Sequence, residues 1–166
     1  MVYVNKVRIF SDKEVSEIDN LWNPLLVVNK EHLEKRGYNN VVVKSKSTIN
    51  KLVDWFNSLE VEKIIKKPED LILHRFSEGH YFDKHTDDVI RQGSKRKYLI
   101  GVALNDNYEG GKFNTYAPNK LTIGDKVGVP YAIKSNVMHE VTKVIKGVRK
   151  TAFVFVNDNH FKKESI

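Results

Sequence analysis

From Leu71 onward the sequence consists of short apolar segments separated by turn-forming residues, and this pattern constrains the fold more than any other feature. The segments have the composition of strands, and Gly, Asn, Asp or Pro occupies most of the gaps. About eight such strands favour a β-barrel or a double-sheet jelly roll. The expected strands span residues 71–76, 81–87, 98–104, 111–116, 121–123, 126–129, 136–145 and 149–156.

The first seventy residues have a mixed pattern that predicts two helices. Ser11-Asp-Lys-Glu14 is a capping-box sequence, in which a serine and a glutamate bind free amides at a helix start. Apolar residues then recur at helical spacing, at Val15, Ile18, Leu21 and Trp22. A second helix is expected from about Ser47, with an apolar face made of Ile49, Leu52, Val53, Phe56 and Leu59. Such a face usually packs against its own domain, although it can also bind a partner.

The chain is long enough for one domain with a substantial core. Its length of 166 residues is close to the commonest domain size of about 100–150, and 40% of the residues are hydrophobic. No repeat or Pro/Gly/Ser-rich linker divides it. We therefore expect a single domain over residues 1–166 that is mainly β with flanking helices (α+β), with helical support over about 1–68 and a β core over about 69–157.

Several functional classes are excluded by composition. Cysteine is absent, which excludes disulfide scaffolds, thiolate zinc sites and cysteine nucleophiles. No run of about 18 apolar residues could span a membrane, and the N-terminal segment lacks the apolar region of a secretory signal. These features predict an intracellular, cytoplasmic protein without a membrane partner. The formal charge of +7 would attract acidic partners, but the basic residues are spread along the chain as on an ordinary solvated surface.

A histidine followed two residues later by an acid occurs twice, and only one pair has the context of a metal site. His32-Leu-Glu34 lies in a charged stretch without a strand pattern and is expected on the surface. His85-Thr-Asp87 ends a predicted strand, where residues two apart point to the same face and can bind one ion. With 21 acidic residues in the chain, such a pair also arises by chance, and an exposed salt bridge is the alternative.

His139 adds a third candidate ligand from a late strand that a barrel can place beside the earlier one. Two imidazoles and one carboxylate leave three positions of an octahedral ion open, which is the arrangement of Fe(II) oxygenases. Ligand types alone also allow a three-ligand zinc site. The remaining histidines receive no role, although His80 could point near the site; they are His74, His80 and His160.

Arg149 begins an apolar strand ten residues after His139 and is costly to bury without a partner. A bound carboxylate suits its planar guanidinium, and Thr151 on the same face could add a hydroxyl. An ion pair with a surface acid is the alternative. If the two segments form a hairpin, a three-residue loop at 145–147 places His139 and Arg149 on one face, whereas a two-residue turn at 146–147 separates them. The carboxylate hypothesis requires the three-residue loop.

Three motifs occur in order between about Leu71 and Val156. The first is an aromatic-x-x-Gly-x-x-aromatic-x-x-His-x-Asp pattern from Phe76 to Asp87. The second joins a strand to a Gly-Gly pair, from Leu104 to Phe113, and the third is His139-Glu-Val141 followed by Gly147-Val-Arg149. With these motifs the sequence resembles the 2-oxoglutarate/Fe(II) oxygenases, specifically their prolyl 4-hydroxylase-like branch.

The resemblance implies a double-stranded β-helix (jelly-roll) core in which His85, Asp87 and His139 bind iron. It also implies that Arg149, with Thr151, holds the distal carboxylate of 2-oxoglutarate, while the keto and near carboxylate oxygens bind the metal. The implied activity is that of a dioxygenase, which converts 2-oxoglutarate into succinate and CO2 while it hydroxylates a substrate. Ascorbate is a further candidate cofactor.

The sequence departs from this branch at several pocket positions. Phe76 and Phe82 stand where tyrosines are usual, so two hydroxyl groups are missing. Gly101 and Ala103 are small where larger residues are common, which would widen the pocket or move the cosubstrate. Lys143 replaces a frequent proline and is expected to add positive charge near Arg149. These departures argue against assuming prolyl specificity.

The basic segment Arg91–Lys97 follows the Asp87 position and bears on the substrate. It is either a loop that closes over an acidic or extended substrate, or a solvated connection. Its charge would help to bind nucleic acid, but no aromatic platform for base stacking accompanies it, so a peptide or protein substrate ranks higher. The hypotheses are a peptidyl hydroxylase, the same chemistry on nucleic acid or a small molecule, and a non-catalytic, cupin-like metal-binding jelly roll.

Overall fold

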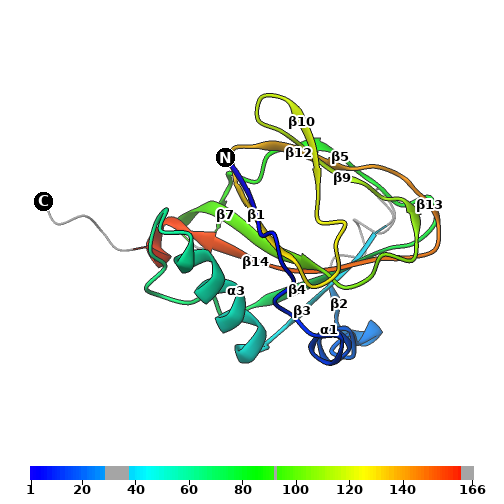
Figure 1. The fold of residues 1–166 in the computed structure, drawn as a ribbon, viewed down its shortest axis with the longest axis horizontal. Helices are drawn as coiled ribbons and strands as arrows, with labels where there is room; N and C mark the ends of the chain where they lie inside the picture. The colour runs from blue at the N-terminus through cyan, green and yellow to red at the C-terminus, as the bar shows by residue number, and fades with distance from the viewer. Residues whose placement is uncertain (29–37, 92, 162–166) are drawn as a thin grey trace, which may run out of the picture.

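Two antiparallel β-sheets lie face to face in the computed structural model of the protein, which describes residues 1–28, 38–91 and 93–161 (Figure 1). The major sheet consists, in spatial order, of β1 (Val2–Val4), β11 (Pro130–Lys134), β7 (Ser94–Ala103), β14 (Arg149–Asn157), β4 (Leu71–Phe76), β3 (Tyr38–Val43) and β2 (Val27–Val28), with β6 (Ile90–Arg91) attached to β7. The minor sheet consists of β10 (Lys120–Ile123), β9 (Phe113–Tyr116), β12 (Met138–Val141) and β5 (Phe82–His85). A two-stranded ribbon pairs β13 (Val144–Lys146) with β8 (Glu109–Gly110). This mainly β architecture confirms the predicted jelly-roll class.

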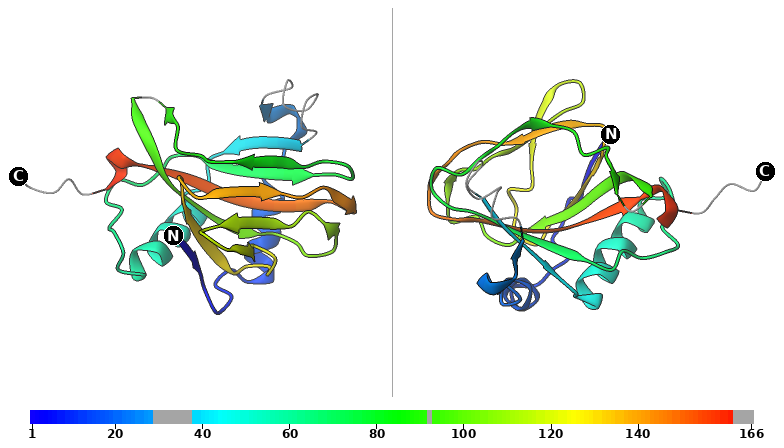
Figure 2. Two further views of the ribbon diagram at one scale, coloured as in Figure 1. Left: turned by 90° about the horizontal axis from the view of Figure 1, so that it is seen from above. Right: turned by 180° about the vertical axis from the view of Figure 1, so that it is seen from behind.

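Two α-helices cover the face of the major sheet that points away from the minor sheet (Figures 1 and 2). Helix α1 (Asp12–Asp19) begins with the predicted capping box, since the Ser11 hydroxyl accepts from the Glu14 amide and the Glu14 carboxylate accepts from the Ser11 amide. Helix α3 (Lys46–Ser58) begins one residue before the predicted start and buries the predicted face. Short 3-10 helices occur at η1 (Pro24–Leu26) and η2 (Asp158–His160). Within the described ranges, no helix has the length and apolarity that a membrane crossing needs.

The major sheet buries different side chains on its two faces. Along β14, Ala152, Val154 and Val156 pack with the two helices. Thr151 and Phe153, on the alternate positions, face the space between the sheets. This period of two follows from the strand pleat, and burial of both faces explains why β14 is an almost continuous apolar run.

The N-terminal part contributes strands as well as helices. β1 pairs with β11, and β3 pairs with β4, so the region expected to give helical support also extends the major sheet. The β-branched run Val41-Val42-Val43 in β3 is the sequence signal that favours a strand there.

Several expected strands differ in the structure. The strand expected at 98–104 begins at Ser94, so Arg91 and residues 94–97 of the basic segment, expected as a loop or connection, lie in β6 and β7. Residues 126–129 form a bend, where Gly128 has a φ of +73° and Val127 makes only an isolated bridge with Ala103. The strand follows directly, as β11. The segment 136–145 is not continuous but divides into β12 and β13.

The expectation of a hairpin between the segments of His139 and Arg149 is wrong. β12 pairs with β9 and β5 in the minor sheet, whereas β14 pairs with β7 and β4 in the major sheet. Between them, β13 pairs with β8. The chain therefore crosses from one sheet to the other, and His139 and Arg149 reach the same cavity from opposite sheets. Neither of the two considered turns decides their relative position.

Candidate functional site

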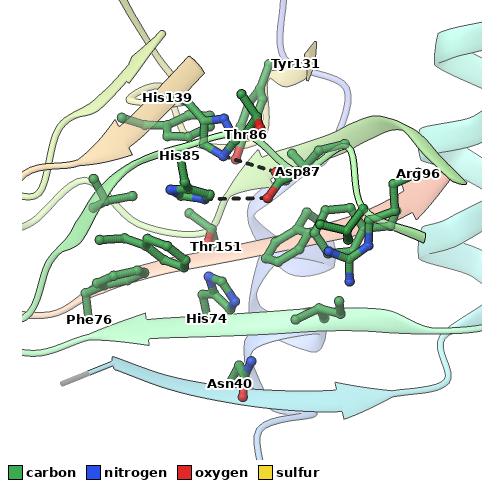
Figure 3. A pocket seen from close by; sticks show the side chains of 18 of the residues that line it. Asn40, His74, Phe76, His85, Thr86, Asp87, Arg96, Tyr131, His139 and Thr151 are labelled. Atoms are coloured by element: carbon green, nitrogen blue, oxygen red, sulfur yellow. Dashed lines mark ion pairs between the residues drawn. The ribbon is translucent and has the colours of Figure 1, made fainter. Parts of the chain in front are cut away.

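Two histidines and one aspartate converge where β5 and β12 run side by side (Figure 3). His85 and His139 are cross-strand partners, and Asp87 lies two residues beyond the end of β5, where its amide donates to the Ser135 carbonyl at 2.8 Å. The Asp87 carboxylate lies 3.1 Å from His139 Nε2 and 3.5 Å from His85 Nε2. One ligand atom from each residue lies within 4.8 Å of the others, so the three side chains can surround one ion.

The hydrogen bonds of the two imidazoles select the nitrogen that faces this point. His85 Nδ1 lies 2.6 Å from the Asp83 carbonyl, and His139 Nδ1 lies 2.9 Å from the Val137 carbonyl. A carbonyl oxygen can only accept, so each Nδ1 is the donor in these contacts, and each ring turns its Nε2 toward Asp87. Backbone contacts of this kind orient metal-binding histidines, and the donor set suits a divalent cation such as Fe(II).

The surroundings keep the Asp87 carboxylate ionised. Burial, the largest single influence, favours its neutral form, but the hydrogen bond and charge of His139, together with His85 and Arg96, outweigh it and hold the pKa of Asp87 below its usual value. Phe82 stacks on the His85 ring at a centroid distance of 3.8 Å, and Phe113 packs edge-on against His139 at 5.5 Å. The site therefore combines a negative ligand with apolar walls.

Arg149 is buried at 3% exposure, and no carboxylate among the described residues lies within ion-pair distance of it. Its Nε is a buried donor without a hydrogen-bond partner in the described part of the chain. The guanidinium lies 5.7 Å from the centre of the Phe76 ring and 5.8 Å from that of Phe113. A buried cation with an unused donor lowers stability unless an anion pairs with it, so this end of the cavity fits a carboxylate.

Loop contacts hold Arg149 in place. The Asn105 side chain donates to the Val148 carbonyl at 2.6 Å and accepts from the Lys150 amide at 2.8 Å, so it is hydrogen-bonded to the chain on both sides of Arg149. Gly111, with a φ of +56°, lies so close that an added Cβ would be 3.2 Å from Arg149 Cδ. The Gly-Gly motif thus allows the backbone to pack against the arginine.

A tyrosine from β11 lies beside Arg149 and occupies space that Gly101 leaves open. Tyr131 pairs with Gly101 across the sheet, and a Cβ on Gly101 would lie 2.8 Å from the Tyr131 hydroxyl oxygen. Burial raises the pKa of Tyr131 to about 12, although the positive charge of Arg149 opposes this shift. The small residue at 101 therefore does not simply widen the pocket, and the Tyr131 hydroxyl stays protonated at neutral pH.

All five residues singled out from the sequence line one cavity of about 540 Å³ between the two sheets. Thr151, at 2% exposure, and His74 are neighbours across β14 and β4. His74 packs against the edges of Phe153 and Phe76, and burial lowers its pKa to about 3, so its imidazole is neutral. The remaining walls are largely aromatic and aliphatic, which is typical of a small-molecule pocket.

Other residues considered from the sequence lie elsewhere. His80 and His160 accept from the Ser77 and Asn157 amides in local turns and do not line the cavity. Lys143 is exposed, with its Nζ over the Tyr81 ring, and it does not line the cavity that contains Arg149. His32 and Glu34 lie outside the described residues.

Among the lining residues that were not predicted from the sequence are His74, Tyr131 and Arg96. His74 alternates with Ile72 and Phe76 on the inner face of β4, so the period of two could have indicated it. Tyr131 was missed because the strand was expected at 126–129. Arg96 belongs to the basic segment, but nothing local indicated which of its charges faces inward.

Comparison with solved structures gives the same fold. A prolyl hydroxylase from Trichoplax adhaerens, in complex with a hypoxia inducible factor oxygen degradation domain peptide fragment, superposes with a TM-score of 0.73 at 17% identity, over 95% of this chain and 84% of that one. The chain has the fold of the 2-oxoglutarate/Fe(II) oxygenases. The sequence matches no protein-family profile.

Two further structures with this fold are similar over most of their length. A viral collagen prolyl hydroxylase from Paramecium Bursaria Chlorella virus-1, in complex with 2-oxoglutarate, gives a TM-score of 0.66 at 20% identity, over 93% of this chain and 95% of that one. A 2OG-Fe(II) oxygenase family oxidoreductase from Burkholderia pseudomallei gives 0.67 at 13% identity, over 93% and 82%. At these identities the likeness concerns the fold.

Proposed function

We propose that this chain is an Fe(II)- and 2-oxoglutarate-dependent dioxygenase that hydroxylates a residue of a peptide or protein, in the manner of a prolyl 4-hydroxylase. The main support is one combination within one cavity. His85, Asp87 and His139 converge there, and Arg149 lies buried there with no carboxylate partner among the described residues. We further propose that residues 1–166 act as a single oxygenase domain.

In this proposal the chain holds both reactants by groups already in position. The two Nε2 atoms and the Asp87 carboxylate would hold Fe(II), and these three protein ligands would leave coordination positions for other ligands. Arg149 would bind the distal carboxylate of 2-oxoglutarate through a charge-assisted pair, with Thr151 and Tyr131 as hydroxyl partners. The lining residues that these two contacts leave unassigned would face the substrate.

When bound, Fe(II) with 2-oxoglutarate and dioxygen supplies the oxidising chemistry, in which one oxygen atom enters the substrate as a hydroxyl, the other enters succinate, and CO2 leaves. The chain contributes orientation and exclusion of water. Phe82 and Phe113 pack on the two histidines and cover part of their surface. The neutral His74 imidazole adds a polar group without charge to the cavity wall.

Spectroscopy without oxygen tests the proposal directly. Addition of Fe(II) and 2-oxoglutarate to the purified protein should give a weak visible metal-to-ligand charge-transfer band, and admission of air, with ascorbate to keep the iron reduced, should give succinate. His85→Ala should lose the band, whereas His160→Ala, outside the cavity, should keep it. Folded wild-type protein that shows neither band nor succinate would establish the non-catalytic, cupin-like alternative.

The substrate class is supported by the fold comparison. The Trichoplax adhaerens neighbour was solved in complex with a peptide fragment, which favours a peptide here. Oxidation of nucleic acid or of a small molecule is the alternative within the same chemistry. Succinate release that is stimulated by peptides but not by oligonucleotides would distinguish a peptide substrate from a nucleic acid.

A further inference from the structure

An arginine at the opposite end of the cavity from Arg149 is aimed inward by an irregularity in β7. The pairing of β14 with β7 shifts between Val156, opposite Tyr98, and Asn157, opposite Arg96. One extra residue on β7 reverses the alternation, so Arg96 lines the cavity although Tyr98 and Ile100 face the helices. Bulges of this kind commonly redirect a side chain beside a functional site.

The Arg96 guanidinium is held on an aromatic ring without a carboxylate partner among the described residues. Its Cζ lies 3.6 Å from the centre of the Phe155 ring, and no described acid lies within 4.0 Å of its nitrogens. Partial burial and the charge of Arg91 lower the pKa of Arg96, and only the more distant Asp87 opposes them. Stacking leaves the edge of the guanidinium, with its N–H donors, available for an anion.

The neighbouring lysines do not compete for this role because they are already paired. Lys95 pairs with Asp88, and Lys97 pairs with Glu62. In the described part of the segment 91–97, the charges that face the cavity are therefore those of Arg91 and Arg96. Two adjacent guanidinium groups suit one localised anion better than the long phosphate backbone of a nucleic acid, which needs an extended basic track.

The position of Arg96 separates it from the proposed cosubstrate contact. Arg149 begins β14, and Phe155 lies six residues, or roughly 20 Å, further along the strand. In Figure 3, Arg96 and Phe76, the ring beside Arg149, lie on opposite sides of His74. An anion at Arg96 would thus be a second one, beyond the metal ligands.

We propose that Arg96, with Arg91 beside it, binds a carboxylate of the substrate, and that the substrate is an acidic peptide segment with an Asp or Glu near the residue to be oxidised. The assignment of this anion to the substrate rests on the proposed function. The existence of an anion site at Arg96 does not. A phosphorylated side chain would offer similar charge and is distinguished by the test.

The chain offers a matched control in Arg75. Arg75 also stacks on an aromatic ring, with its Cζ 4.4 Å from the centre of Trp22, but it is paired with Asp19 at 2.9 Å and does not line the cavity. The two arginines therefore differ in the feature that carries the proposal, namely a stacked guanidinium that lacks a described acid partner and faces the cavity.

The test follows the arginine Nε–H signals by NMR in the full chain, with and without Zn(II) and 2-oxoglutarate. Two flexible peptides of Gly and Ser are titrated into the protein in separate experiments. One has a central Pro between two Asp residues, and in the other both Asp residues are replaced by Asn. The Arg96 signal, assigned from Arg96→Gln, should shift and saturate with the Asp peptide, with an affinity at least about tenfold higher than for the Asn peptide. Arg96→Gln should lose this preference, and Arg75→Gln should keep it.

Each other outcome overturns the proposal. Equal affinity for the two peptides, or a preference that survives Arg96→Gln, removes the anion site. Selective binding of a phosphoserine peptide or of oligo-dT in place of the Asp peptide removes the carboxylate assignment. Because NMR needs no turnover, an anion site at Arg96 in a protein without the charge-transfer band would separate failure of the proposed function from failure of this inference.

Discussion

Asn105 shows how one side chain outside the cavity sets the position of a charge inside it. Its amide group forms hydrogen bonds to the residues before and after Arg149, so the start of β14 is fixed to the loop after β7. A displacement of this strand end by one residue would turn Arg149 away from the cavity. Asn105 is therefore a positioning residue in the proposed function.

Asn105→Ala should weaken 2-oxoglutarate binding and lower stability together. Both bonded backbone groups lose their side-chain partner, which corresponds to about 1–3 kcal/mol in the free energy of unfolding. Denaturant titration and the charge-transfer band give the two quantities. Asn107→Ala, in the same loop but bonded to Asn105 rather than to β14, should have the smaller effect on both.

Gly101→Ala tests whether the space beside Gly101 is filled. The new Cβ would lie 2.8 Å from the Tyr131 hydroxyl oxygen and 3.1 Å from Phe153 Cβ, so we expect overpacking and a loss of about 1–3 kcal/mol of unfolding free energy. Tyr131→Phe in the same chain removes the nearest atom and should recover part of the loss. Strict additivity of the two changes in a double-mutant cycle would contradict the contact.

At the scale of elements, the capping box of α1 gives a local prediction. Ser11→Ala removes the hydroxyl that accepts from the Glu14 amide, and the expected cost is about 1 kcal/mol of unfolding free energy. Ser16→Ala, an exposed position within the same helix, is the control and should be nearly neutral. Thermal or denaturant unfolding of both variants measures the difference, and equal effects would argue against the cap.

Elements with a strong local signal were predictable from the sequence. The capping box located α1, the apolar face located α3, and the apolar runs gave β4 and most of β14. Strand bounds were less predictable where they depend on pairing with a distant strand. β11 begins with a proline, and the strand was expected in the preceding segment, 126–129. The division between β12 and β13 arises because the two strands pair with different partners.

The site was predictable as a set of residues but not as a geometry. His85, Asp87, His139, Arg149 and Thr151 line one cavity, yet the hairpin argument that linked His139 to Arg149 failed because the two strands belong to different sheets. Sheet membership is a long-range property that alternation within a strand does not encode. For the same reason Tyr131 and Arg96, brought in by cross-strand pairing and a bulge, were not found.

At the scale of the whole molecule, charged side chains line one cavity between the two sheets at separate positions. The helices fill the outer face of the major sheet, which leaves its inner face for the polar residues of the cavity. Buried Arg149, Thr151 and His139 cost stability in the absence of ligands, because their polar groups are removed from water. A protein of this kind should therefore gain stability when its ligands bind.

Ligand-linked stabilisation measures this gain across the whole chain. Under anaerobic conditions, a ligand at about 100 times its dissociation constant should raise the free energy of unfolding by about 2.7 kcal/mol if it binds only the folded state. His85→Ala should lose the increment from Fe(II), since the ion loses one of three ligands, whereas His160→Ala should retain it. Arg149→Gln should keep the increment from Fe(II) and lose most of the further one from 2-oxoglutarate, because the metal ligands are intact while the distal carboxylate has lost its ion pair. An Arg149→Gln variant that 2-oxoglutarate stabilises as much as the wild type would place the carboxylate elsewhere in the cavity.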